Sequence, residues 1–197
     1  MFLAKWTMSV AEYICMTKGT PEGEHDLVWS LYNDHNGNRH WQYKVETSDN
    51  GVVLLIESSI KFEKEPDSGT FVFKEIKIPE SEWYKVKVTL NPIIQLKEIG
   101  KKNPKRVPLI KKEHVESFVE NIFLINGFEI KSFNASKPMG TMSMKGINFV
   151  KSEVVGVVKV IDKQKVLNAI EKGIGKERSY GCGMLCLTPI NEPDFED

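Results

Sequence analysis

One histidine of this 197-residue chain stands where proton transfer is easy to arrange. Thr20 and Pro21 combine a capping hydroxyl with a proline suited to a first helical turn, so the sequence predicts a helix from about Pro21 to Tyr32. His25 lies in the first turns of that helix. The positive end of a helix disfavours imidazolium, which leaves the ring able to accept or give a proton near pH 7, and the same end offers N–H groups to a phosphate. His25 is therefore the candidate for general acid or general base catalysis.

The remaining histidines are interpreted as structural or surface residues, because they fall in a polar turn, at the start of a strand and on a solvent-facing helical turn: His35, His40 and His114. No nucleophilic triad is recognisable. Histidines, cysteines and carboxylates nowhere show the spacing of a metal site, so we expect neither a metal nor any other cofactor.

A glycine-rich segment is the second candidate for chemistry. Its four glycines bracket two cations: Gly173, Gly175, Lys176, Arg178, Gly181 and Gly183. Glycines let backbone N–H groups approach an anion closely, and the cations add charge. The segment follows a predicted helix and precedes a strand, the reverse of a dinucleotide fingerprint, and it has no Gly-Lys-Ser/Thr ending. A flexible connection and a phosphate-binding loop both remain open.

A basic segment, Lys101–Lys112, carries six basic residues and no acid. A solvated linker would explain it, but so would a basic surface shared with the glycine-rich segment. The whole chain has 27 basic and 27 acidic residues, yet residues 1–100 contain 11 basic and 15 acidic residues, and residues 101–197 contain 16 and 12. This asymmetry indicates an anionic partner for the second half, either a nucleic acid or a membrane surface.

Composition and targeting signals narrow the class of protein. Hydrophobic residues make up 41% of the chain, enough for a packed core and too many for a disordered chain. The longest purely apolar run, Val52–Ile56, falls far short of the ~20 residues of a membrane span, and the N-terminus lacks a signal-peptide pattern. Cys15, Cys182 and Cys186 are too few for a disulfide framework or a zinc site, which indicates reduced thiols. We expect a cytoplasmic protein with no membrane partner.

The elements that position these residues follow one pattern in each half. The first half predicts a strand over Phe2–Val10, the helix carrying His25, and then three further strands. Residues 63–82 show no clear pattern, and we expect a shortened or missing helix there. Those strands are His40–Glu46, Val52–Ser58 and Tyr84–Leu90, the first two joined at Asp49-Asn50-Gly51, which is a hairpin turn signal.

The second half predicts a short strand over Val107–Ile110 and a helix over Lys112–Ile125. The elements after it are strands over 127–133 and 154–161 (with 148–150 in a hairpin before the latter), a helix over Lys163–Lys172 capped by Asp162, and a strand over Met184–Leu187. We therefore predict an α+β protein of two tandem ferredoxin-like domains. The first covers residues 1–92, a linker 93–106, the second 107–189 and an acidic tail 190–197.

Three segments carry a resemblance to a known family. Arg106–Lys111, Leu90–Pro92 and above all Gly173–Pro189 resemble the CasE family, the precursor-RNA endoribonucleases of type I-E CRISPR Cascade complexes. The resemblance implies two ferredoxin-like (RRM-like) domains. It also implies metal-independent cleavage of CRISPR repeat RNA at the base of its stem-loop by 2′-hydroxyl attack, and retention of the product as a Cascade subunit bound to the other subunits.

The resemblance assigns catalysis to His25. Some members have a tyrosine three residues earlier, and a lysine and a serine further along the helix; the corresponding residues here are Glu22, Ser30 and Asn33. It also implies an RNA-binding surface made of the glycine-rich segment and of basic residues around it. That surface comprises Lys105, Arg106, Lys111, Lys137, Lys145, Gly173, Gly175, Lys176, Arg178, Gly181 and Gly183.

Two other interpretations stay open. A protein of the same fold could bind the RNA hairpin as a scaffold without cleaving it, which Glu22 makes conceivable. A tandem ferredoxin-like interaction protein could use the glycine-rich segment only as a connector.

Overall fold

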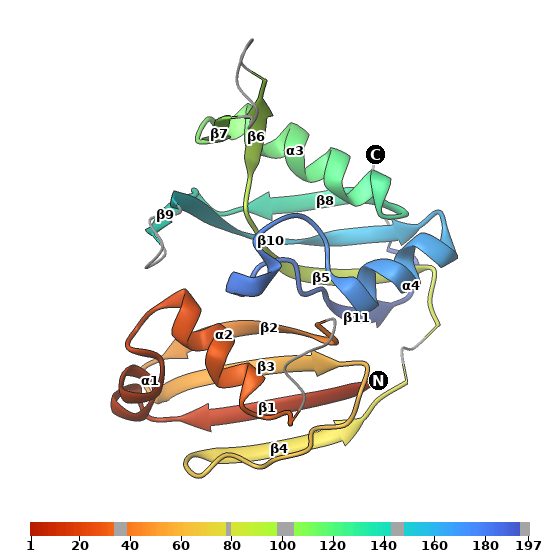
Figure 1. Ribbon diagram of the computed structural model, residues 1–197. Coiled ribbons are helices and arrows are strands. Elements are labelled where there is room, and N and C mark those ends of the chain that lie inside the picture. Colours follow the sequence, from red (N-terminus) through yellow and green to blue (C-terminus); the bar gives the residue numbers. More distant parts are fainter. Residues whose placement is uncertain (34–38, 78–79, 98–104, 143–147, 194–197) are drawn as a thin grey trace.

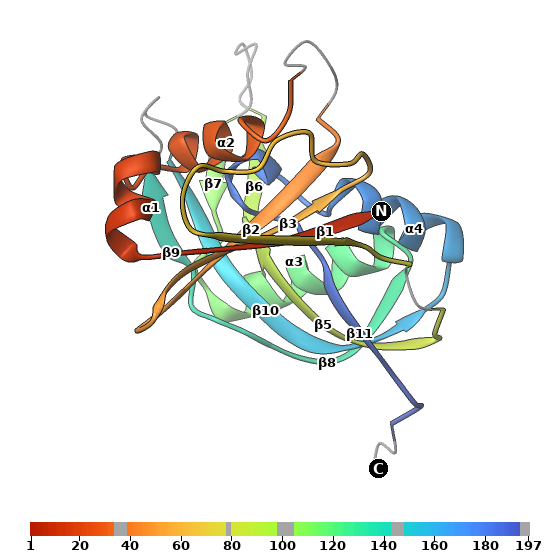
Figure 2. The ribbon, with the colours of Figure 1, turned by 90° about the horizontal axis from the view of Figure 1, so that it is seen from below.

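The computed structural model describes residues 1–33, 39–77, 80–97, 105–142 and 148–193, which form two antiparallel sheets covered by helices (Figure 1). The first sheet contains β1 (Phe2–Met8), β2 (Trp41–Ser48), β3 (Gly51–Ser58) and β4 (Thr70–Glu75), in the order β2-β3-β1-β4. The second contains β5 (Trp83–Leu90), β8 (Phe128–Ala135), β10 (Asn148–Val160) and β11 (Cys186–Ile190), in the order β11-β5-β10-β8. Strand β9 (Met139–Met142) pairs with the start of β10. In Figure 2 the strands of the two sheets run obliquely to each other.

Both sheets have the ferredoxin-like strand order. With the strands numbered within each unit, the first sheet reads 2-3-1-4, and the second reads 4-1-3-2, which is the same order taken from the other end. In both sheets the first and third strands lie in the centre. Helices α1 (Val10–Thr17) and α2 (Pro21–Trp29) cover the first sheet, while α3 (Lys112–Ile125) and α4 (Lys163–Lys172) cover the second. Each sheet has its own apolar core, one around Trp6, Leu54 and Ile56 and the other around Val88 and Val154. The predicted architecture of two tandem ferredoxin-like units is confirmed.

The start of the first unit contains a helix that the sequence pattern missed. The predicted strand runs to Val10, but β1 ends at Met8 and α1 begins at Val10. Ser9 caps this helix: its hydroxyl accepts the N–H of Glu12 at 3.2 Å, and the Glu12 carboxylate accepts the N–H of Ser9 at 2.8 Å. This is a capping box, and the Ser-x-x-Glu spacing was readable in the sequence.

The unassigned stretch between residues 63 and 82 contains a strand. Strand β4 lies antiparallel to β1 at the sheet edge, with Phe2 opposite Glu75. The described part of the stretch, residues 63–77 and 80–82, contains no helix, where the sequence analysis expected a shortened or missing one. Phe71 and Phe73 pack against the first core, while Val72 between them is 62% exposed.

The strand assigned to the end of the first unit belongs to the second sheet instead. Strand β5 pairs with both β10 and β11, and its inward residues lie in the second core. The segment over Val107–Ile110 is not the first strand of that unit either, because β7 (Lys105–Pro108) pairs with β6 (Ile93–Leu96) in a separate hairpin. We therefore propose that the two domains divide before Trp83, rather than at residue 92. The two ends of the expected linker, Ile93–Leu96 and residues 105–106, lie in this hairpin, and residues 98–104 lie outside the described part.

The helices of the second unit have the predicted bounds. Helix α3 covers Lys112–Ile125, and α4 covers Lys163–Lys172, where the Asp162 carboxylate accepts the N–H of Lys165 at 3.1 Å. The expected long hairpin is the pairing of β9 with β10, and the final strand, β11, begins two residues later than predicted. Of the predicted tail, β11 includes residue 190, and residues 194–197 lie outside the described part.

Charged side chains connect the two units. The Lys44 ammonium on β2 is buried and lies 3.1 Å from the Glu46 carboxylate and 2.9 Å from the Glu153 carboxylate on β10. Lys87 on β5 contacts the same two carboxylates at 3.0 and 3.2 Å. Because each carboxylate faces two cations, their pKa values lie below the usual range. The network fixes β2 against the second sheet, which places the two units side by side.

A buried carboxyl lies at the same junction. The Glu57 carboxylate on β3 accepts a hydrogen bond of 2.9 Å from the Gln42 amide, which also donates to the carbonyl of Ile170 at the end of α4. Burial raises the pKa of Glu57 to about 7, against the opposing effect of that hydrogen bond. The Gln42 Oε1 atom is buried and has no partner among the described residues.

Replacing Glu57 by glutamine is expected to stabilise the protein clearly more at pH 8 than at pH 5. A folded-state pKa above the unfolded value of about 4.3 means that stability falls as the pH rises from about 4.3 to 7, by on the order of 3 kcal/mol. The neutral amide removes this dependence and can donate to Gln42 Oε1. Urea unfolding of wild type and Glu57→Gln at both pH values measures the difference. A gain equal at pH 5 and pH 8 would contradict the titration of Glu57.

Two further expectations concern thiols and membrane segments. The three cysteines are all free thiols, and burial raises the pKa of Cys182 to about 12, so this thiol is protonated and unreactive. None of the helices in the described ranges combines the length and apolarity needed to cross a bilayer.

Candidate active site

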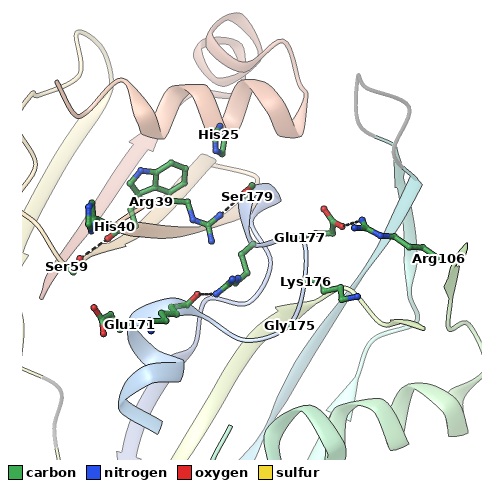
Figure 3. A pocket seen from close by; sticks show the side chains of 13 residues that line it. His25, Arg39, His40, Ser59, Arg106, Glu171, Gly175, Lys176, Glu177 and Ser179 are labelled. Carbon is green, nitrogen blue, oxygen red and sulfur yellow. Dashed lines mark hydrogen bonds and ion pairs between the residues drawn. The ribbon is translucent and has the colours of Figure 1, made fainter. Parts of the chain in front are cut away.

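A groove of about 770 Å³ lies between the two units (Figure 3). Its walls come from α2 and the start of β2 on one side and from the glycine-rich segment after α4 on the other. Five lining residues are basic: Arg39, Arg106, Lys172, Lys176 and Arg178. Two carboxylates, Glu171 and Glu177, also line it. Basic side chains therefore outnumber acidic ones, and the groove suits a polyanion.

His25 lines this groove from α2, the helix on which the sequence placed it. The helix begins as predicted, since the Thr20 hydroxyl accepts the N–H of Gly23 at 3.1 Å with Pro21 in the first turn, but it ends at Trp29 rather than Tyr32. The imidazole packs against the Trp41 ring with centroids 5.1 Å apart, and its Nδ1 lies 3.5 Å from the exposed Asp26 carboxylate. The side chain is 25% exposed. His25 is thus held in place by an aromatic contact while part of its ring stays accessible from the groove.

A buried hydrogen-bond cluster fixes α2 next to the glycine-rich segment. The Glu24 carboxylate is buried and accepts hydrogen bonds from the hydroxyls of Tyr13 and Tyr43, the latter at 3.2 Å. The Tyr43 hydroxyl also lies 3.1 Å from the carbonyl of Ser179 in the opposite wall. Burial and the Glu24 carboxylate hold the pKa of Tyr43 well above its usual value, so the hydroxyl stays protonated and donates. Glu24 and Tyr43 therefore set the position of the His25 helix relative to the opposite wall.

Replacing Tyr43 by phenylalanine is expected to lower the free energy of unfolding by about 2 kcal/mol. The buried Glu24 carboxylate then keeps only its hydrogen bond from Tyr13, and the carbonyl of Ser179 loses the Tyr43 hydroxyl beside it. Chemical denaturation measures this loss. Tyr84→Phe is a suitable control: the Tyr84 hydroxyl also has a hydrogen bond, from the Ser81 N–H at 3.0 Å, but it lies away from the groove. A double-mutant cycle tests the coupling of Tyr43 with Glu24. If Tyr43→Phe costs the same stability in wild type and in Glu24→Gln, the two residues are not coupled.

The glycine-rich segment is a packed connection rather than an open cradle of N–H groups. All four glycines have positive φ, and three of them, Gly173, Gly181 and Gly183, are buried. The N–H groups of Gly173, Ile174 and Gly183 donate to the carbonyls of Ala169, Gly183 and Thr89 at 2.7–2.9 Å. These three donors are therefore engaged within the protein. Gly175 is the one glycine of the four that lines the groove.

The basic residues of the segment reach the groove by different routes. Lys176 is exposed and lines it directly. Arg178 also lines it, although its guanidinium donates to the carbonyl of Lys172 at the end of α4. Arg106 joins them from β7 and forms an ion pair of 2.6 Å with Glu177. The structure thus brings together His25, Arg106, Gly175, Lys176 and Arg178 from the predicted set.

Other predicted residues lie outside the groove. Lys105 is exposed on β7 and Lys111 is the N-cap residue of α3, and neither lines the groove. Lys137 follows β8 and lines a separate pocket of about 580 Å³ beside the start of α3. Lys145 lies outside the described residues.

Two helper positions, which follow the end of α2, make contacts elsewhere. The Ser30 hydroxyl donates to the carbonyl of Leu27, and the N–H of Asn33 donates to the Glu63 carboxylate at 2.6 Å. Neither residue lines the groove, and neither does Glu22.

Arg39 and Trp41 are site residues that the sequence interpretation missed. Arg39 Nη1 donates to the Ser179 hydroxyl at 2.9 Å, and the guanidinium lies over the Trp41 ring. The sequence did contain a signal for them. They are two residues apart where a strand was predicted to begin, and this spacing places both side chains on the same face of the strand. Among the residues described, no group of three or more histidines, cysteines and carboxylates could hold a metal ion.

Comparisons with known proteins agree with this architecture. The family model described as "CRISPR associated protein" matches residues 1–189. A structure of CRISPR endoribonuclease Cse3 bound to a 19-nucleotide RNA superposes with a TM-score of 0.81 at 15% identity, over 96% of this chain and all of that one. No functionally curated protein gave a significant sequence match.

Two Escherichia coli structures are also similar. The CRISPR-associated protein Cas6e of strain K-12 superposes with a TM-score of 0.74 at 20% identity, over 96% of this chain and all of that one. A chain of E. coli Cascade bound to a PAM-containing double-stranded DNA superposes with a TM-score of 0.56 at 15% identity, with the same coverage. At these identities the likeness is one of fold, and it extends over both units.

Proposed function

The chain belongs to the family of CRISPR associated proteins, and from this membership we propose that it is a metal-independent endoribonuclease that cleaves CRISPR repeat precursor RNA. The observation that carries the proposal is the position of His25, partly exposed in a groove where basic residues outnumber acidic ones. A similar fold occurs in an endoribonuclease bound to RNA, which supports the same activity for this groove.

The proposed reaction uses a nucleophile that the RNA itself supplies. The 2′ oxygen of the ribose forms a bond to the adjacent phosphorus, the bond from phosphorus to the 5′ oxygen breaks, and the products are a 2′,3′-cyclic phosphate and a 5′-hydroxyl. One proton leaves the 2′-hydroxyl and one is added to the 5′ oxygen. His25 is proposed to carry one of these protons, as base or as acid, a contribution typically worth about 10²–10⁴-fold in rate.

The basic residues around His25 fit the recognition of an RNA stem. An A-form stem is bound largely through its shape and its phosphates. Lys176, Arg178 and Arg106 line the groove together with His25, and we propose that they contact phosphates near the cut. We propose that cleavage occurs at the base of the repeat stem-loop. Lys105, Lys111, Lys137 and Lys145 stay candidates for more distant contacts with the stem.

The proposal extends to partners and location. A chain of similar fold is part of E. coli Cascade, which supports retention of this protein on its product as a subunit of such a complex. A cytoplasmic location is part of the same proposal.

The test is end-group analysis of a repeat hairpin after incubation with the protein in EDTA. The proposal expects a single cut at the base of the stem, a 2′,3′-cyclic phosphate on the upstream fragment and a 5′-hydroxyl on the other. A 3′-hydroxyl with a 5′-phosphate, or cleavage only when magnesium is added, would contradict it.

The second candidate function, a non-catalytic scaffold that binds the RNA hairpin, is favoured by Glu22, Ser30 and Asn33, because these residues put no lysine, serine or tyrosine helper into the groove. It predicts hairpin binding without cleavage. A third possibility, an interaction protein unrelated to RNA, predicts no steep dependence of hairpin affinity on salt. Binding measured between 50 and about 200 mM salt, alongside the cleavage assay, separates all three.

A further inference from the structure

Arg39 and His25 lie against the same aromatic ring at the groove. The Arg39 guanidinium carbon is 5.5 Å from the centroid of the buried Trp41 ring, and the centroid of the His25 imidazole is 5.1 Å from the same point. Figure 3 shows the two side chains entering the groove from the start of β2 and from α2. The Arg39 guanidinium carbon and the His25 ring centroid are thus at most about 11 Å apart, which is the upper end of the span that one phosphate covers with a hydrogen bond of about 2.9 Å to each side chain.

The partners that the structure gives Arg39 are neutral. Its Nη1 donates to the Ser179 hydroxyl at 2.9 Å, and its plane faces the indole of Trp41. Within the described part of the chain, no carboxylate lies within ion-pair distance of Arg39. Burial, and after it the nearby Arg178 guanidinium, lower the pKa of Arg39. A half-buried cation beside a second cation is unfavourable unless an anion joins them.

The other two arginines of the groove have partners of different kinds. Arg106 already has a carboxylate partner in Glu177, and Arg178 donates to the carbonyl at the end of α4. Among the described residues, Arg39 and Arg178 thus both lack a carboxylate partner, and Arg39 is the one of the two that shares the Trp41 ring with His25.

Resting on the proposed function, we propose that Arg39 binds the non-bridging oxygens of the scissile phosphate and stabilises the charge that builds on them as the 2′ oxygen attacks. Arginine suits this task because its planar fork can donate two parallel hydrogen bonds to a phosphate and stays protonated at neutral pH. Arg39 transfers no proton: the protons move at the 2′ and 5′ oxygens. In this arrangement Trp41 sets the spacing between the group that moves a proton and the group that holds charge.

A purely structural role for Arg39, connecting the start of β2 to the opposite wall through Ser179, predicts a different result. With such a role, the Arg39 variants would lose stability and hairpin affinity, and sulfur at the scissile phosphate would slow them as much as it slows wild type. The test therefore compares two RNA substrates as well as several variants.

The experiment measures single-turnover cleavage of a repeat hairpin at saturating protein, together with hairpin affinity and thermal stability, for wild type, Arg39→Ala and Arg39→Lys. Removal of one charge-stabilising donor typically lowers the rate by about 10²–10³-fold. We expect a loss of this size in Arg39→Ala with a change in affinity of no more than about 10-fold, and partial recovery in Arg39→Lys. Lys131→Ala is the control, and its single-turnover rate should stay within about 5-fold of wild type, because Lys131 is paired with Glu129 on β8 and does not line the groove.

A phosphorothioate at the scissile position provides the second comparison. If Arg39 contacts a non-bridging oxygen, sulfur at that position slows wild type in one stereoisomer, and the same substitution has less effect in Arg39→Lys and Arg39→Ala. The inference would be overturned if sulfur slowed wild type and both variants equally, or if Arg39→Ala cleaved at the wild-type rate. In either case cleavage by the wild type would still support the proposed function. Should Arg39→Ala fail to fold, the substrate comparison in Arg39→Lys decides alone. A wild type that cleaves neither substrate would instead contradict the proposed function.

Discussion

Replacing His25 by alanine is expected to lower the rate of hairpin cleavage by about 10²–10⁴-fold while changing hairpin affinity by only a few-fold. The imidazole contributes one partly exposed ring to the groove, whereas the charges that would hold RNA belong to other side chains. Its removal leaves the cap of α2 intact, because that cap depends on Thr20. The result should therefore be a protein that folds, binds the hairpin and does not cut it.

Single-turnover rates at saturating protein isolate this effect, and His40→Ala is the matched control. His40 lines the same groove and is exposed. Among the described residues its hydrogen bonds are made by its backbone carbonyl, which accepts from the N–H of Ser59 at 2.9 Å. We expect His40→Ala to cleave within a few-fold of wild type. If His40→Ala loses cleavage, or if His25→Ala keeps it, the proton transfer must be assigned to a residue other than His25.

The same variant can show which proton His25 carries. An RNA with sulfur in place of the 5′ oxygen at the cut has a leaving group that departs without protonation. If His25 is the general acid, this substrate should restore most of the rate lost in His25→Ala. If His25 is the base on the 2′-hydroxyl, the sulfur substrate should be cut as poorly by the variant as the ordinary one.

The elements that the sequence predicted well are those whose ends depend on neighbouring residues. Helix α4 has its predicted bounds because Asp162 caps it locally, and the hairpin of β2 and β3 is set by the turn before Gly51. Strand β4 was not predictable in this way. Its apolar run Phe71-Val72-Phe73 shows no alternation of polar and apolar residues, and it forms because β1 offers an edge to pair with. Strand β5 was recognised as a strand, but its sheet depends on pairing with residues 62 to 76 positions later.

The site divides along the same line. His25 could be identified because a helix start is a local feature, and Lys176 and Arg178 because charge among glycines is visible in the sequence. Arg39 could not, since its position follows from a contact with Ser179, 140 residues away. The glycines were identified as special residues, but whether their N–H groups face an anion or the protein is decided by packing against β2 and β5.

Gly183 is where that packing is tightest, and Gly183→Ala is expected to lower the free energy of unfolding by about 3 kcal/mol. Its φ of +87° is unfavourable for a residue with a side chain, by about 1–2 kcal/mol. A Cβ at this position would also lie 2.3 Å from the carbonyl oxygen of Ile174, a backbone atom that cannot move alone. Overpacking of this kind adds about 1–3 kcal/mol.

The consequences should extend to the groove. Gly183 donates to the carbonyl of Thr89 on β5 at 2.7 Å and accepts from the N–H of Ile174 at 2.9 Å, so a shift at this residue loosens the segment that carries Lys176 and Arg178. We therefore expect weaker hairpin binding together with the loss of stability. Gly19→Ala separates the two causes, because Gly19 has a similar φ of +63° but nothing within 4 Å of an added Cβ. Urea unfolding should show a loss of about 1–2 kcal/mol for Gly19→Ala and a clearly larger loss for Gly183→Ala. Equal losses in the two variants would mean that the segment can yield around Ile174, and that the close packing of the glycine-rich segment does not hold the groove together.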